Sequence, residues 1–134
     1  MKKHIKIYCD FFGYGEQDYK PSEISGLPLE DVHHISQKGL GGSKKLDTIR
    51  NLIGLTREEH DRAHRKKKPY LSKKKLQEIH DSSIFDRLLL VTNDLILDHR
   101  TLKMKKIDKQ DYLLKKLPKE DREYFENLLA AYYF

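Results

Sequence analysis

Four of the seven histidines lie between positions 33 and 64 and could bind a metal ion together: His33, His34, His60 and His64. His60 and His64 are four residues apart in a segment expected to be helical, so their side chains would lie one turn apart on the same face. That spacing lets two imidazoles bind one metal ion. Neither this pair nor the adjacent pair His33–His34 is a specific signal alone, but the four together indicate a histidine-rich metal site.

Two short strands and a loop are expected to carry the first two of these histidines. Residues 31–35 predict one strand, and the apolar run 52–55 predicts a second strand that returns beside it. Between them, the glycine-rich segment 38–43 predicts a loop with unusual backbone angles. Adjacent residues of a regular strand point to opposite faces, so His33 and His34 can serve one site only if the strand bends or ends there.

A helix is expected to carry the other two histidines. Thr56 followed three residues later by Glu59 is a capping-box pattern, so the helix should begin at Thr56. It can run to about Lys68, because Pro69 prevents smooth continuation. From residue 30 to residue 68 the predicted order is therefore strand, long loop, strand and helix.

The N-terminal part, residues 1–20, is interpreted as a short strand followed by a loop. The strand is predicted over residues 4–9, where apolar and polar side chains alternate, and glycines and prolines mark residues 10–30 as irregular loops. Cys9 is the only cysteine, which excludes an internal disulfide and a Cys-rich zinc site, and it is interpreted as a buried free thiol. The three remaining histidines, His4, His80 and His99, are interpreted as solvent-exposed or packed in the core.

The C-terminal half, residues 70–134, is expected to be mainly helical. Apolar residues recur there at helical spacing, and a last helix is expected to begin near Pro118. These apolar stripes are interpreted as core; the first consists of Ile84, Leu88, Val91 and Leu95. The predicted fold class is therefore α+β, with a small ββα unit over residues 21–69 and a helical extension.

The central segment resembles the HNH endonuclease motif. The resemblance rests on Asp31-Val32-His33-His34-Ile35, Gly41-Gly42, Asn51-Leu52-Ile53-Gly54-Leu55, His60 and His64. His34 and Asn51 are 17 residues apart, Asn51 and His60 are 9 apart, and His60 and His64 are 4 apart. The resemblance covers about residues 20 to 68, roughly a third of the chain. It implies a ββα-metal finger, in which a two-stranded antiparallel hairpin and a helix surround one divalent ion.

The resemblance also implies a role for each motif residue. His34 matches the general base that activates water, and Asn51 matches the asparagine that braces the backbone carrying this base. His33, His60 and His64 match metal ligands. These roles make His34 and Asn51 the expected catalytic and supporting residues of the site.

The sequence departs from the family at the positions of a structural zinc. Many HNH proteins carry two Cys-x-x-Cys pairs around the motif, and the corresponding positions here are Ser22, Ser25, Thr56 and Glu59. Serine and threonine do not replace a thiolate as a zinc ligand. We therefore expect no structural zinc.

A basic segment follows the predicted metal-binding helix. The formal net charge is +6, and positions 62 to 75 contain no acidic residue. Such a segment is typical of a polyanion-binding surface, although it can also be a solvated basic face. The residues expected to contact nucleic acid are Arg50, Arg62, Arg65, Lys66, Lys67, Lys68, Lys73 and Lys74.

These features together predict a metal-dependent endonuclease that cleaves DNA, with 5′-phosphate and 3′-hydroxyl products implied by the family resemblance. A neutral imidazole suits proton abstraction at physiological pH, and imidazole ligands favour zinc, nickel or manganese over magnesium. Two alternatives stay open: a non-catalytic nucleic-acid-binding module with a structural metal, and an RNA-directed nuclease. The helical extension could form a homodimer or dock DNA. No apolar run has membrane-spanning length, and a cytoplasmic location, in a cell or in a phage-infected host, is expected.

Overall fold

A computed structural model of the chain describes residues 2–37, 46–94 and 103–134. Within these residues the fold is α+β, with a two-stranded antiparallel hairpin and five α-helices, as expected in outline. The chain forms two compact units, Met1–Asp81 and Ser82–Phe134. In chain order the elements are α1 (Lys3–Phe12), β1 (Asp31–His34), the 3-10 helix η2 (Ile49–Asn51), β2 (Leu52–Leu55), α2 (Arg57–Ala63), α3 (Lys73–Asp94), α4 (Lys103–Lys115) and α5 (Lys119–Tyr133).

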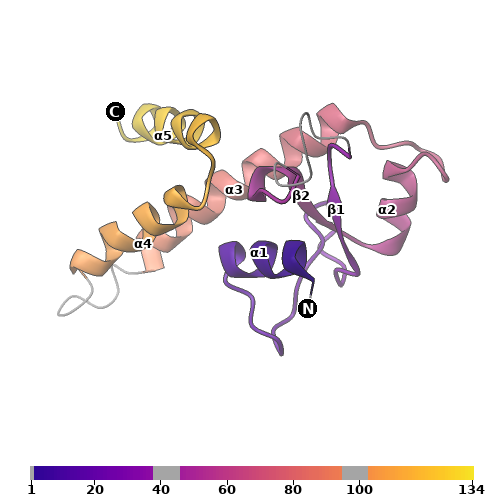
Figure 1. The fold of residues 1–134 in the computed structure, drawn as a ribbon, viewed down its shortest axis with the longest axis horizontal. Coiled ribbons are helices and arrows are strands. Elements are labelled where there is room, and N and C mark those ends of the chain that lie inside the picture. The colour runs from indigo at the N-terminus through magenta and orange to yellow at the C-terminus, as the bar shows by residue number, and fades with distance from the viewer. Residues whose placement is uncertain (1, 38–45, 95–102) are drawn as a thin grey trace. The chain divides into compact units, whose positions relative to one another are not determined.

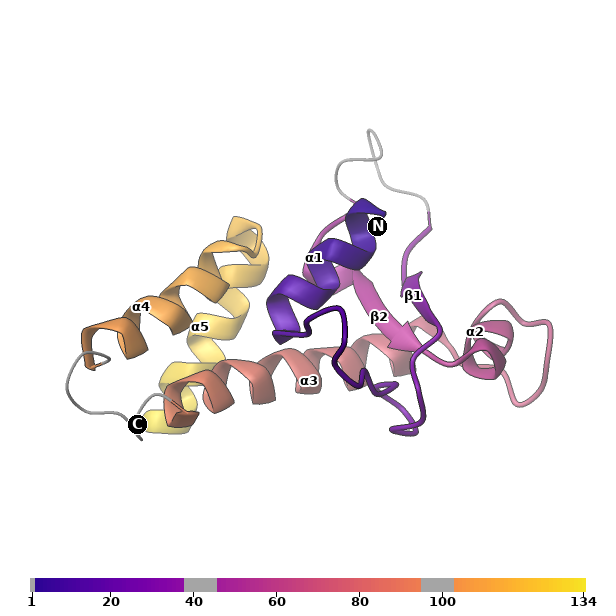
Figure 2. The same ribbon diagram turned by 90° about the horizontal axis from the view of Figure 1, so that it is seen from below.

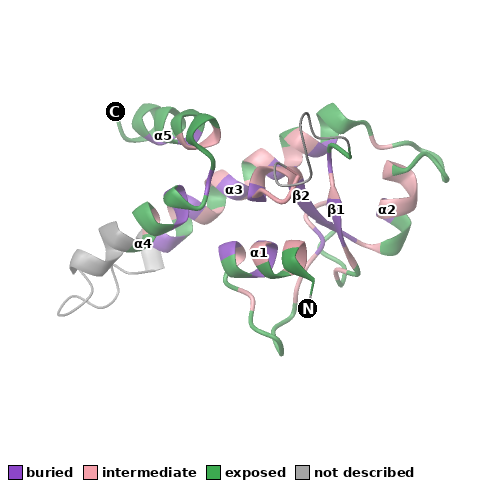
Figure 3. Ribbon diagram, in the orientation of Figure 1, coloured by how far each residue is buried: buried purple, intermediate pink, exposed green. Residues whose placement is uncertain are grey.

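The hairpin β1–β2 is the centre of the first unit, and both of its strands were predicted. His33 pairs with Ile53 and His34 pairs with Leu52. All four residues of β2 are buried (Figure 3). The side chains of Leu29 and Tyr8 approach the backbone at Gly54 so closely that only glycine fits. A Cβ atom there would lie 2.2 Å from Leu29 Cδ1 and 2.6 Å from the Tyr8 hydroxyl. The strand therefore packs tightly at the position where it carries no side chain.

Helix α2 begins as predicted but ends earlier than expected. Both hydrogen bonds of the capping box between Thr56 and Glu59 are present. The expectation of a helix to about Lys68 is wrong, because α2 ends at Ala63 and Arg65 adopts a left-handed conformation with φ 63°. The Arg65 amide donates to the Arg62 carbonyl and the Lys66 amide to the Asp61 carbonyl, which is the bonding pattern of a Schellman C-cap.

The N-terminal segment is a helix, so the strand predicted over residues 4–9 is wrong. Six residues are too few to separate the two periodicities, and Ile5, Tyr8 and Cys9 also fit helical spacing. Tyr8 and Cys9 are buried in α1, which confirms a buried thiol, and Gly13 ends the helix with φ 75°. In Figure 2, α1 lies beside the hairpin on the side away from α2.

The first part of α3 belongs to the same unit as the hairpin, so this unit extends past residue 69 to Asp81. Leu76 is 1% exposed and packs in one buried cluster with Ile35, Ile53 and Leu55. Ala63 of α2 and Leu71, both partly buried, pack against this cluster. The hairpin is thereby held by helices from before and after it in the chain.

The second unit contains the rest of α3 with α4 and α5, and α5 begins after Pro118 as predicted. Its buried apolar side chains include Ile84, Leu88, Val91, Leu113, Leu114, Leu117, Phe125 and Leu129. The predicted loop 38–43 and Leu95 lie outside the described residues. None of the helices within the described ranges has the length and apolar character needed to cross a membrane.

Candidate metal centre

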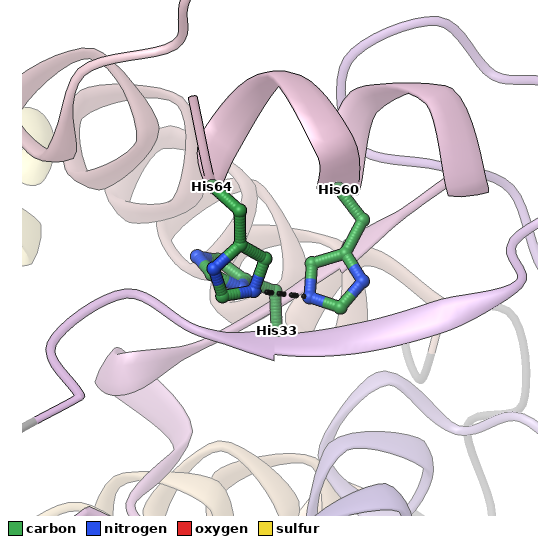
Figure 4. A group of neighbouring side chains, drawn as sticks. All are labelled: His33, His60 and His64. Atoms are coloured by element: carbon green, nitrogen blue, oxygen red, sulfur yellow. Dashed lines mark hydrogen bonds between the residues drawn. The ribbon is translucent and has the colours of Figure 1, made fainter. Parts of the chain in front are cut away.

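Three of the four predicted histidines converge between β1 and α2 (Figure 4). His33 comes from β1, His60 from α2, and His64 from the C-cap position of α2. One ring nitrogen from each lies within 4.8 Å of the others, and the Nε2 atoms of His60 and His64 are 3.0 Å apart. These three imidazoles are therefore close enough to hold one metal ion.

His33 is the buried member of this group. His33 is 5% exposed, and its Nδ1 atom has no hydrogen-bond partner within the described parts of the chain. Burial, followed by the neighbouring His60 and His64, lowers the pKa of His33 to about 4. Burial and His60 also lower the pKa of His64. Both rings are therefore neutral at physiological pH, which is the form that binds a metal, and a buried unpaired nitrogen fits a ligand atom.

A carboxylate supports the group from the strand. The Nδ1 of His60 lies 3.1 Å from Oδ2 of Asp31, which also accepts a hydrogen bond from Arg57 Nε at 2.8 Å. Asp31 is two residues before His33, so both point to the same face of β1. Asp31 was not among the expected site residues, although this i, i+2 relation could have indicated it.

His34, the fourth predicted histidine, does not join the group of three. It is the last residue of β1, and its Nε2 lies 2.8 Å from Oδ1 of Asp47. Its ring centroid is 4.9 Å from that of His4 in α1. Burial, and then His34, lower the pKa of His4. The structure thus places His34 in a separate cluster with His4 and Asp47, neither of which was expected there.

Asn51 fixes the backbone that follows His34. Its Oδ1 accepts from the Ser36 amide at 2.8 Å, and its Nδ2 donates to the carbonyls of Ser36 and Leu46 at 3.1 and 3.0 Å. The Asn51 carbonyl in addition accepts from the Ile35 amide. Asn51 therefore ties together the two ends of the segment between the strands.

Hydrogen bonds join the four residues that stand where the resembled motif has cysteines: Ser22, Ser25, Thr56 and Glu59. The buried carboxylate of Glu59 accepts from the Ser22 hydroxyl at 2.5 Å and from the Thr56 amide at 2.8 Å, and the Ser22 hydroxyl accepts from the Ser25 amide at 3.3 Å. Burial raises the pKa of Glu59, but hydrogen bonds from Ser22, Ser25 and Thr56 outweigh it and lower the pKa. An ionised carboxylate thus links residues 22–25 to the start of α2.

The residues predicted to contact nucleic acid differ in exposure: Arg50 and Arg62 are partly buried, and the others are exposed. The Arg50 guanidinium forms two hydrogen bonds with Asp81, at 3.1 and 3.0 Å. Arg62 donates to the Pro69 carbonyl at 2.7 Å, and Arg65 lies 4.8 Å from the Tyr70 ring centroid. The exposed members are Arg65, Lys66, Lys67, Lys68, Lys73 and Lys74.

Comparisons with known proteins find no matching family model, no matching curated protein and no matching solved structure. The function is therefore inferred from the residues and their geometry.

Proposed function

We propose that this chain is a metal-dependent endonuclease of the HNH type that hydrolyses DNA phosphodiester bonds. The observation that carries the proposal is the convergence of His33, His60 and His64 on one point beside the hairpin. Strand β1 of this hairpin ends in His34, and Asn51 braces the backbone just beyond it. The combination supports a ββα-metal finger in which ligands, base and brace come from the positions that the motif assigns.

His33, His60 and His64 would bind one divalent metal ion. Bound there, such an ion supplies charge neutralisation for the phosphate oxygens and stabilises the leaving oxygen. Three protein ligands leave coordination positions open, as a catalytic site needs. The all-imidazole donor set favours zinc, nickel or manganese over magnesium, which prefers oxygen ligands.

His34 would act as the general base through its Nδ1 atom. A carboxylate only accepts hydrogen bonds, so in the neutral ring the Nε2 proton is donated to Asp47 and Nδ1 keeps its lone pair. Water adds its oxygen to phosphorus while Nδ1 takes the proton, and the bond from phosphorus to the 3′ oxygen breaks. The products carry a 5′-phosphate and a 3′-hydroxyl, the latter completed by a proton from solvent.

The exposed basic segment after α2 would hold the flanking phosphates. Residues 65–68 follow directly on the ligand His64, and Lys73 and Lys74 open α3. Lysine and arginine contacts of this kind bind the DNA backbone without reading sequence and weaken as salt rises.

A non-catalytic nucleic-acid-binding module is the second candidate. It is favoured by one observation: His34 pairs with Asp47 and packs against His4 instead of joining the three-histidine group. Such a module would bind DNA in a salt-dependent way and unfold on chelation, but would not turn over.

The test is cleavage of supercoiled plasmid by the purified chain with Mn²⁺, Ni²⁺, Zn²⁺ or Mg²⁺, with EDTA and an RNA substrate run in parallel. The proposal expects nicked or linear DNA with at least one metal and none with EDTA. End-labelling of the product should show a 5′-phosphate. Tight DNA binding without cleavage in all four metals would instead support the second candidate, and cleavage of RNA alone would reassign the substrate.

A further inference from the structure

Asp31 lies between two partners at the edge of the candidate metal centre. Its Oδ2 is 3.1 Å from Nδ1 of His60 and 2.8 Å from Nε of Arg57, and its Oδ1 is 3.3 Å from a second guanidinium nitrogen of Arg57. The Asp31 side chain is 22% exposed, whereas that of Arg57 is 67% exposed. The carboxylate is thus mostly enclosed, whereas the guanidinium side chain that pairs with it is largely in solvent.

We propose that Asp31 is a positioning residue that fixes the ring orientation and tautomer of His60, so that Nε2 is the atom presented to a divalent cation. A carboxylate is only an acceptor, so the proton on the neutral His60 ring must reside on Nδ1. The lone pair is then on Nε2, the atom that lies 3.0 Å from Nε2 of His64. The inference rests on the proposed metal-binding function and adds a residue to that site.

The alternative is a purely structural role, in which Asp31 only forms the ion pair with Arg57. Exposed ion pairs of this kind contribute about 0–1 kcal/mol, so such a pair alone gives little reason for the carboxylate to matter at the site. Arg57→Ala removes this ion pair and leaves the contact with His60. It is therefore the matched control for Asp31→Ala.

The first measurement needs no metal. Long-range ¹H–¹⁵N spectra of the metal-free protein report which nitrogen of each histidine ring carries the proton. We expect an Nδ1–H tautomer for His60 in the wild type and in Arg57→Ala, and loss of that preference in Asp31→Ala. An Nε2–H tautomer in the wild type, or an unchanged His60 signal in Asp31→Ala, would overturn the proposal.

The second measurement is metal affinity, by calorimetric titration with Zn²⁺ and Mn²⁺ alone. Asp31→Ala should weaken binding about 10- to 100-fold, the usual cost of removing a partner of a ligating histidine, and Asp31→Asn should shift it less in the same direction. Arg57→Ala should stay within about 3-fold of the wild type, since an exposed ion pair contributes little. Asp47→Ala, which removes the equivalent partner of His34, should also leave the affinity unchanged.

The two measurements separate failure of this inference from failure of the proposed function. If the wild type binds metal and a folded Asp31→Ala variant binds it equally well, the role of Asp31 is refuted and the metal site stands. If the wild type binds neither metal, the proposed function fails and the metal-presenting role of Asp31 fails with it. Circular dichroism of each variant shows that the fold is kept, and Asp31→Asn, which preserves side-chain size, decides the outcome if Asp31→Ala does not fold.

Discussion

The rings of His33 and His34, neighbours in β1, contact different groups of side chains. His33 has its ring centroid 4.9 Å from that of His60 and 5.0 Å from that of His64. The ring centroid of His34 is 4.9 Å from that of His4, which belongs to α1. Side chains alternate along a strand, which explains these different partners. Because β1 ends at His34, the regular alternation stops at this residue, so both histidines can still serve one site.

These different partners predict that metal binding and cleavage can be abolished independently. His34→Ala should eliminate DNA cleavage, a loss of about 100-fold or more for a general base, and leave metal affinity nearly intact. His33→Ala should remove both, because it deletes a ligand. Calorimetry and plasmid cleavage on the same two variants check this. Loss of metal binding in His34→Ala would mean that His34 is itself a ligand.

Asn51→Ala is expected to reduce cleavage without changing metal affinity. The substitution removes three hydrogen bonds to the backbone of residues 36 and 46, so the segment beyond His34 loses its fixed geometry. At about 1 kcal/mol per hydrogen bond, the free energy of unfolding should fall by about 2–3 kcal/mol. Urea unfolding and single-turnover cleavage measure the two effects. A variant with full activity would show that Asn51 does not position the base.

The metal-free protein should lose stability when acid forces a proton onto His33. Its pKa is about 4 in the folded chain and 6.5 when unperturbed, so between these values the unfolded chain binds more protons. Stability is then fully present above pH 6.5 and falls as the pH drops toward 4, by about 3 kcal/mol in all. Urea unfolding in EDTA should show this loss in the wild type and a smaller one in His33→Asn. Parallel curves for the two proteins would contradict the assignment.

The buried pair of His80 and Glu23 predicts the opposite dependence on pH. His80 is 0% exposed, with Nδ1 2.8 Å from the Glu23 carboxylate and Nε2 2.5 Å from the Ile49 carbonyl. Both ring nitrogens face acceptors, so the ring is an imidazolium. Burial lowers the pKa of His80, but the charge of Glu23 and these hydrogen bonds outweigh it and raise the pKa.

His80→Leu should therefore lower the free energy of unfolding by about 3–5 kcal/mol at pH 6, because it leaves the carboxylate of Glu23 buried without its cation. Since the folded pKa of His80 is raised, its contribution is complete below pH 6.5 and is lost as the pH rises through the folded value. The difference between wild type and variant should accordingly shrink at high pH. Urea unfolding at several pH values tests this, with exposed Lys75→Ala as the control.

Arg65 should tolerate glycine but not a β-branched residue. It occupies the left-handed C′ position of the α2 cap at φ 63°, where glycine is usual and valine is strained. Arg65→Val should lower the free energy of unfolding by about 1–2 kcal/mol, whereas Arg65→Gly should stay within about 1 kcal/mol of the wild type. Lys66→Val, which removes the same charge at the next residue, is the control. Equal effects of the two valines would rule out backbone strain as the cause.

The sequence alone determined the features whose partners lie within a turn or a strand. The capping box of Thr56 and Glu59, the start of α5 after Pro118 and the two strands are local patterns, and each is present. The i, i+4 spacing of His60 and His64 likewise placed both rings on one side of α2. Backbone geometry fixes such relations before any packing occurs.

Only the tertiary structure decided which distant residues meet. Glu59 accepts a hydrogen bond from Ser22, 37 residues away, and Arg50 pairs with Asp81, 31 residues away. His34 contacts Asp47 and also His4. His4 lies in a helix, where the alternation of residues 4–9 had predicted a strand. Each of these polar groups had several candidate partners in the sequence. The choice among them follows from how α1 and α3 pack on the hairpin, because buried polar groups must be paired where the backbone places them.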